Sequence, residues 1–250
     1  MPRSSQLTYI MDVDAAIIAI KQYNASSTLL TADSLLRQHF PTISASLDHS
    51  TMAERVVLLD ALWATRLFME SGSTERIIGS LITHAAEIER VLLALPSNAL
   101  ENDPHLVVAA AQRLLPVILH LTADDGSKPR QNYSFATKFF HWVTRHHFPI
   151  VDSKARKCIS EIQAYHNASN RVRKYPPYTD LSYLEEYPRW ILFYSDLIAG
   201  LTLDVKERLL TADGESQPTS RRAQNSLLRI LDKVFYIQGG GTGLGQMTDS

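Results

Sequence analysis

A lysine and an aspartate, Lys138 and Asp152, are the residues of this chain whose types and surroundings indicate chemistry. Lys138 lies in the strongly apolar stretch 135–142, among phenylalanines and a tryptophan. Burial among such side chains disfavours the charged ammonium, and an amine held partly neutral is a nucleophile. Asp152 follows a proline turn at the start of a further helical stretch. A carboxylate brought near the amine can take up its proton or stabilise a developing cation.

Two interpretations of this pair are open at the level of sequence. In the first, Lys138 attacks the anomeric carbon of a sugar and forms a Schiff base, with Asp152 supporting charge and proton transfer. In the second, the Lys138 stem covers neighbouring aromatic rings at the surface while its amine stays in water. Asp152 is then the N-cap of the helix that follows it.

The elements that position the pair are predicted to be helices, because apolar residues recur at the 3.6-residue helical period far more often than in the strict alternation of a strand. The sequence lacks a convincing hairpin signal, so the predicted fold class is all-α. The expected helices cover 11–23, 32–40, 50–72, 74–95, 104–121 with a kink at Pro116, 134–145, 152–166, 181–200, 204–210 and 227–237. Ser134 is the expected N-cap of the helix that carries Lys138. Residues 212–220 have the composition of a linker.

Turn composition near residue 125 predicts the division of the chain. We expect an N-terminal helical half over 1–125 and a second helical half over 126–238 that carries the lysine and the aspartate. The glycine-rich residues 239–250 are expected to form a disordered tail.

Length and composition are those of a globular protein. The 250 residues include 45% hydrophobic and 20% charged residues, with a formal net charge of −1. A balanced charge excludes bulk attraction to nucleic acid, so any such binding needs a local basic patch. The single cysteine, Cys158, fits a reducing compartment. No apolar run reaches the ~20 residues of a membrane helix, and the N-terminus lacks a signal pattern, so we expect a cytoplasmic protein without membrane contact.

The lysine motif resembles a known superfamily. The matching positions are Phe135, Thr137, Lys138, His141 and Trp142, followed by Ile150, Asp152 and Ala155. This pattern is similar to that of helix-hairpin-helix DNA glycosylases, and closest to bacterial proteins that resemble 8-oxoguanine DNA glycosylase. The match covers about a tenth of the chain. Residues 133–136 replace the glycines of the family's hairpin, and no cysteine cluster marks an iron–sulfur site.

The resemblance implies a DNA glycosylase that excises a damaged or modified base, with Lys138 as nucleophile and Asp152 as its carboxylate partner. Such an enzyme flips the base out of the stack, and a lysine Schiff base also permits strand cleavage. No cofactor is expected. The residues expected to contact the base are His141, Trp142, Phe139 and Tyr175. Those expected to contact DNA phosphates are Arg145, Lys154, Arg156, Lys157, Arg171, Arg173 and Lys174; the alternative is a solvated basic face.

A metal site and a non-catalytic function are two further possibilities. His141, His146 and His147 cluster near the motif, but their spacing does not present two ligands to one metal, and we expect no metal site. The alternative function is a non-catalytic helical interaction or regulatory protein, for example a defence-system component, that keeps the motif for packing.

Overall fold

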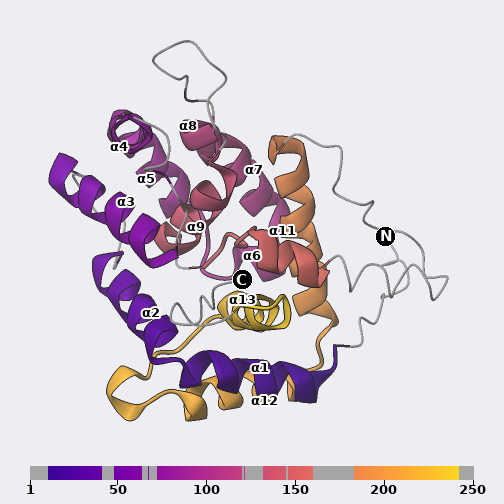
Figure 1. The fold of residues 1–250 in the computed structure, drawn as a ribbon. Helices are drawn as coiled ribbons and strands as arrows, with labels where there is room; N and C mark the ends of the chain where they lie inside the picture. The colour runs from indigo at the N-terminus through magenta and orange to yellow at the C-terminus, as the bar shows by residue number, and fades with distance from the viewer. Residues whose placement is uncertain are drawn as a thin grey trace, which may run out of the picture. The chain divides into compact units, whose positions relative to one another are not determined.

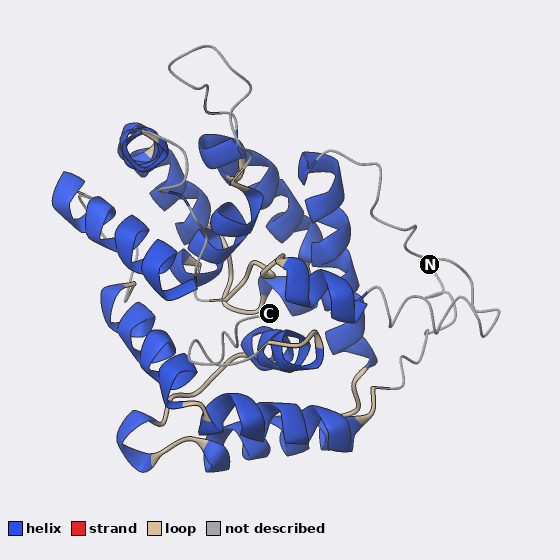
Figure 2. Cartoon of the chain, viewed as in Figure 1, coloured by secondary structure: helices blue, strands red, loops and turns tan. Residues whose placement is uncertain are grey.

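The computed structural model describes residues 11–40, 48–63, 67, 72–119, 121, 132–144, 146–159 and 183–241. Every regular element within these ranges is helical, which confirms the predicted all-α class (Figures 1 and 2). No helix in the described part of the chain is both long enough and apolar enough to span a membrane.

The described residues form two compact units. Unit 1 comprises residues 11–34, 152–159 and 192–241, and unit 2 comprises described residues between 35 and 151 together with 183–191. This partition differs from the predicted division near residue 125. The reason is that the buried face of the first helix packs on C-terminal helices rather than on its neighbours in sequence.

Three capped helices lie entirely within unit 1. They are α1 (Val13–Ala25), α12 (Leu203–Ser216) and α13 (Leu227–Gln238). The N-cap side chains of Asp12, Thr202 and Ser226 each accept a hydrogen bond from the backbone three residues on, which satisfies an otherwise unpaired amide. Helix α1 packs against both α12 and α13. Figure 1 shows α1 and α12 side by side beneath α13.

Helix α12 continues through part of the predicted linker. The sequence predicted a helix over 204–210 and a linker over 212–220, whereas α12 ends at Ser216 and a short 3₁₀ helix, η2, covers Thr219–Arg221. Ala212 and Asp213 are buried, and Asp213 accepts several hydrogen bonds from other parts of unit 1. This tertiary bonding outweighs the low helix propensity of Gly214.

Seven helices lie entirely within the described part of unit 2. They are α3 (His49–Trp63), α4 (Ser73–Thr83), α5 (Ala85–Leu93), α6 (Ala99–Asn102), α7 (Pro104–Leu114), α8 (Pro116–Leu119) and α9 (Tyr133–Val143). Helix α9 packs on α3 and α8. Two further helices, α2 (Ser27–His39) and α11 (Tyr183–Gly200), contribute residues to both units.

Two predicted helices are interrupted, one of them without an expected break. The predicted helix over 74–95 is divided at His84. There the Thr83 hydroxyl donates to the Gly79 carbonyl and His84 Nδ1 contacts the Ser80 carbonyl, so side chains share acceptors with the backbone ladder. The predicted interruption at Pro116 is present between α7 and α8, since proline has no N–H for the ladder.

Candidate functional site

Lys138 is buried on α9. Ten of the eleven residues of this helix are buried, and the Lys138 residue is 5% exposed. Its Nζ lies 5.4 Å from the centroid of the Trp63 ring, a cation–π distance. The interpretation with a solvated amine at the surface therefore does not describe Lys138. The helix begins at Tyr133, after Asn132, so Ser134 is inside the first turn and is not the predicted N-cap.

The rings expected to contact a base are packed inside unit 2. Phe139 meets Phe40 and Phe140 edge-on, at centroid distances of 5.8 and 5.5 Å. The Trp142 ring lies under the Arg37 guanidinium and meets His146 edge-on. Phe139 and Trp142 are both buried, so their side chains contribute to the core around Lys138. Tyr175 lies outside the described residues.

The segment 148–151, which ends one residue before Asp152, is held by side chains of two helices. The Val151 amide donates to Thr137 Oγ1 at 3.1 Å, and His141 Nδ1 contacts the Phe148 carbonyl at 2.7 Å. The Tyr187 hydroxyl of α11 donates to the Pro149 carbonyl at 2.7 Å. All of these bonds lie within unit 2. They fix the backbone of an extended segment that has no helical ladder of its own.

His141 has a defined role in this arrangement. A carbonyl only accepts, so the contact with Phe148 requires Nδ1 to carry the proton. The His141 ring stacks on His146 at a centroid distance of 4.6 Å. His146 has a φ of 72°, a backbone conformation that residues other than glycine seldom adopt. Burial lowers the pKa of the neighbouring His147. His141 thus joins α9 to the turn before the 148–151 segment.

Asp152 is a half-buried N-cap. Its Oδ1 accepts hydrogen bonds from the Lys154 and Ala155 amides, both at 2.9 Å, at the start of the helical residues 153–159. The capping interpretation is therefore confirmed, while the chemical role of Asp152 stays a prediction. Burial, and then the Asp152 charge, raise the pKa of Tyr236 within unit 1.

The predicted phosphate contacts have different surroundings. Lys157 is exposed and Arg156 is half-buried. Lys154 Nζ donates to the Gly240 carbonyl at 2.9 Å and so joins the helical residues 153–159 to the end of α13. The other predicted contacts lie outside the described residues; they are Arg145, Arg171, Arg173 and Lys174.

Residues 239–241, which follow α13, pack closely against Lys154 and Tyr236. A Cβ atom on Gly239 would overlap the Lys154 carbonyl, and one on Gly241 would overlap the Tyr236 ring. Gly240 has a φ of 86°, which favours glycine. The disordered tail predicted from residue 239 therefore does not include residues 239–241; residues 242–250 lie outside the described part of the chain.

Replacement of Gly239 by alanine is expected to destabilise the protein by about 1–3 kcal/mol, because backbone must move to admit the new methyl group. The measurement is the urea unfolding midpoint followed by circular dichroism. The matched control is Gly214→Ala in α12, where a Cβ atom meets nothing within 4 Å. That change is expected to be neutral or to stabilise by about 0.5–1 kcal/mol. Equal midpoints for the two variants would contradict the close approach at Gly239.

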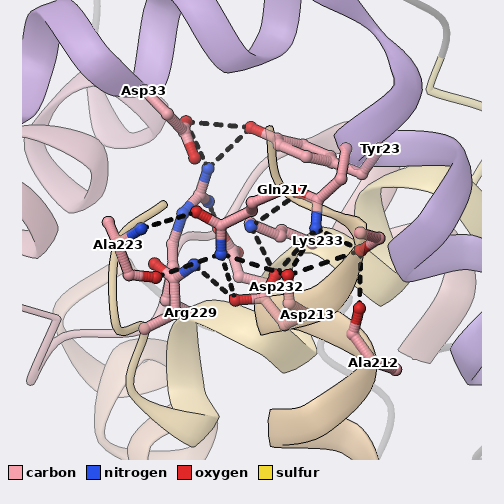
Figure 3. Close-up of polar contacts among 12 residues, drawn as sticks. Tyr23, Asp33, Ala212, Asp213, Gln217, Ala223, Arg229, Asp232 and Lys233 are labelled. Atoms are coloured by element: carbon pink, nitrogen blue, oxygen red, sulfur yellow. Dashed lines mark hydrogen bonds and ion pairs between the residues drawn. The ribbon is translucent and has the colours of Figure 1, made fainter. Parts of the chain in front are cut away.

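The most heavily charged part of the interior lies in unit 1, far from the lysine motif in sequence. We call it the buried charge network (Figure 3). Arg229 is fully buried and pairs with Asp33 at 2.6 Å and Asp232 at 2.5 Å. Lys233 pairs with Asp213 at 2.6 Å. The network comprises Tyr23, Asn24, Asp33, Asp213, Gln217, Asn225, Arg229, Asp232 and Lys233.

Burial and ion pairing shift the pKa values of the carboxyl groups and the lysine of this network in opposite directions. Burial raises the pKa of Asp232 to about 7, the Arg229 charge opposes the rise, and the Asp152 charge adds to it. Burial lowers the pKa of Lys233, and the Asp213 carboxylate only partly offsets it. For Asp213 the attraction of Lys233 and the hydrogen bonds outweigh burial, so its pKa is below the ordinary value. Two cations facing three carboxylates thus leave Asp232 as the group that takes up a proton near neutral pH.

Sequence reasoning missed this network, although a signal was present. Arg229, Asp232 and Lys233 have the i, i+3 and i+4 spacing of a single helix face, within a helix whose other residues are almost all apolar. Charges placed inside an apolar stripe indicate buried partners elsewhere. Those partners, on α1, α2 and α12, lie about 15–200 residues away along the chain and carry no motif.

Comparison of the chain with protein-family models, with curated proteins and with solved structures finds no match. Within the described ranges, no group of three or more histidine, cysteine, aspartate or glutamate side chains is arranged to hold a metal ion.

Proposed function

We propose that this protein is a DNA glycosylase-like enzyme that cleaves the N-glycosidic bond of a damaged or modified base. Lys138 is its nucleophile and Asp152 is the carboxylate that accepts the lysine proton. The observation that carries the proposal is the burial of the Lys138 residue on α9, which is 5% exposed, with its amine over the Trp63 ring. The motif's resemblance to glycosylases adds the substrate class.

The surroundings of Lys138 support a reactive amine. A lysine amine can act as a nucleophile, and the Lys138 residue is held among apolar side chains rather than in bulk water. The rings of Phe135 and Phe139, on the same helix, stack with their centroids 5.9 Å apart, so this part of α9 is apolar. A lysine with a purely solubilising role would instead lie at the protein surface.

The proposed reaction forms and breaks one bond at the sugar. The Lys138 nitrogen bonds to C1′ of the deoxyribose while the bond from C1′ to the base breaks, and the base leaves with the electron pair and gains a proton. The carboxylate of Asp152 takes the proton that the lysine loses. The C1′–O4′ bond then opens: its electron pair stays on O4′, which takes the proton held by Asp152, and the nitrogen lone pair forms a protonated imine between Lys138 and the sugar. The proton on the departing base comes from water.

Borohydride trapping tests the proposal, because hydride reduces the imine to a stable secondary amine. Wild-type protein incubated with duplexes that contain 8-oxoguanine, alkylated or deaminated bases is expected to yield a covalent protein–DNA adduct. Lys138→Gln removes the nucleophile and is expected to abolish the adduct, a loss of at least about 10³-fold. The measurement is the shifted band on a denaturing gel, with the modified residue identified by mass spectrometry.

The matched control is Lys21→Gln, which removes an exposed lysine of α1 and is expected to leave adduct formation within about threefold of wild type. Unfolding midpoints of both variants show whether Lys138→Gln is folded. The absence of an adduct and of base release with every duplex would contradict the proposal. An adduct that persists in Lys138→Gln would move the chemistry to another residue.

Two observations favour a second candidate, a helical interaction protein without catalysis. The Oδ1 atom of Asp152 is engaged in an ordinary N-cap, and Lys138 over Trp63 is also a stable packing arrangement. On this view Lys138→Gln and Asp152→Asn change the unfolding midpoint and nothing else. A wild-type protein that neither traps nor releases any base would favour this candidate.

A further inference from the structure

We infer that Thr137 is a positioning residue for the proposed reaction, which fixes the 148–151 segment to the helix that carries Lys138. The inference rests on the proposed function. Thr137 belongs to the motif by sequence, but the motif gives it no role. The structure supplies one through hydrogen bonds that all lie in unit 2.

The Thr137 hydroxyl is fully engaged. Its side chain is buried, and Oγ1 donates to the Ser134 carbonyl at 3.2 Å while it accepts from the Val151 amide at 3.1 Å. A hydroxyl has one proton to donate, so the donation to Ser134 directs a lone pair at Val151. The bond to Val151 therefore depends on an oxygen at this position of α9.

The placement of this bond is specific. Thr137 immediately precedes Lys138, and Val151 immediately precedes Asp152. One hydrogen bond thus joins the chain neighbours of both proposed reacting groups. Reaction rates fall steeply when reacting groups shift, and a displacement of about 1 Å can cost about 10²-fold.

Thr144 offers a matched comparison on the same stretch of chain. Its buried hydroxyl donates to the His141 carbonyl at 3.3 Å and accepts from the His147 amide at 3.1 Å. The chemistry is the same as at Thr137, but the amide that it holds lies in the turn before the 148–151 segment. A purely structural role for such hydroxyls predicts similar effects at the two positions.

The experiment compares Thr137→Val with Thr137→Ser and Thr144→Val in borohydride trapping on the duplex that wild type traps best. Thr137→Val is expected to lower the adduct-forming rate at saturating DNA by about 10- to 100-fold, with the half-saturating DNA concentration within about threefold of wild type. Thr137→Ser keeps the hydroxyl and is expected to restore the rate to within about threefold. Thr144→Val is expected to stay within about threefold, even where its unfolding midpoint falls as far as that of Thr137→Val.

The outcomes separate this inference from the function on which it rests. An active wild type with equal rates in Thr137→Val and Thr144→Val would overturn the positioning role alone. A Thr137→Ser variant as slow as Thr137→Val would do the same. A wild type that forms no adduct would overturn both the function and this inference. If Thr137→Val fails to fold, Thr137→Ala removes the same hydroxyl and takes its place in the comparison with Thr137→Ser.

Discussion

Replacement of Arg229 by methionine is expected to destabilise the protein by about 3–5 kcal/mol at neutral pH. Arg229 is fully buried, and its guanidinium contacts Asp33, Asp232 and the Tyr23 hydroxyl. Methionine fills much of the same volume but leaves two buried carboxyl groups without their cation. The cost comes from those uncompensated charges more than from lost contacts.

The loss should depend on pH in a defined direction. Burial already raises the pKa of Asp232 to about 7 while Arg229 is present, and removal of the cation raises it further. A carboxyl group whose folded pKa exceeds its unfolded pKa binds a proton on folding, so the free energy of unfolding falls as pH rises through that interval. The deficit of Arg229→Met is therefore expected to be largest above pH 7 and smaller at pH 5. The measurement is urea unfolding of both proteins at several pH values.

Arg208→Met provides the control in the same unit. Arg208 pairs with Asp14 at 2.7 Å, but both side chains are exposed, so the change is expected to cost less than about 1 kcal/mol. A deficit in Arg229→Met no larger than that of Arg208→Met would contradict the buried position of the guanidinium. A deficit that grows toward pH 5 would contradict the assignment of Asp33 and Asp232 as its partners.

Sequence periodicity predicted the helices well where burial follows an apolar stripe. Helices α1, α9 and α13 lie close to their predicted positions, because helical spacing of large apolar residues records which face is buried. Helix α3 begins close to its predicted start but ends at Trp63, before the predicted end at residue 72. The errors occur where tertiary bonds decide. Asp213 extends α12 through a predicted linker, and a predicted helix is divided at His84, where neither a proline nor a glycine marks the break.

The sequence predicted the site only in part, for a related reason. The apolar neighbours of Lys138 predicted an unusual lysine, and the structure encloses it. The residues that hold the 148–151 segment were not predicted as a group, because Thr137 and His141 come from α9 while Tyr187 comes from α11. Hydrogen bonds from a side chain to a distant backbone amide or carbonyl leave no spacing pattern in one sequence.

Replacement of Asp213 by asparagine is the second change expected to have a large effect, again about 3–5 kcal/mol at neutral pH. Asp213 accepts hydrogen bonds from Lys233, Asn24 and Asn225. An asparagine amide supplies one oxygen in place of two and turns a donor toward other donors. Lys233, which is almost fully buried, then has no carboxylate partner in this part of the network.

The pH dependence of this variant should have the opposite sign to that of Arg229→Met. Burial lowers the pKa of Lys233 and Asp213 is the main group that opposes it, so Asp213→Asn lowers the pKa further. A lysine whose folded pKa lies below its unfolded pKa releases a proton on folding, so the free energy of unfolding rises with pH through that interval. The deficit of Asp213→Asn is therefore expected to shrink as pH rises from 7 to about 10.

Lys233→Met identifies the group responsible for this dependence. In that background the amine is absent, and Asp213→Asn is expected to cost less than it does alone and to show no recovery at high pH. Recovery that persists without Lys233 would assign the titration to another group. We expect the stability deficit of Arg229→Met to shrink at acid pH and that of Asp213→Asn to shrink at alkaline pH. Together these results would establish that Arg229 pairs with two carboxyl groups, whereas Lys233 pairs with Asp213 alone. Both variants recovering toward the same pH extreme would be incompatible with the ion pairs of α13.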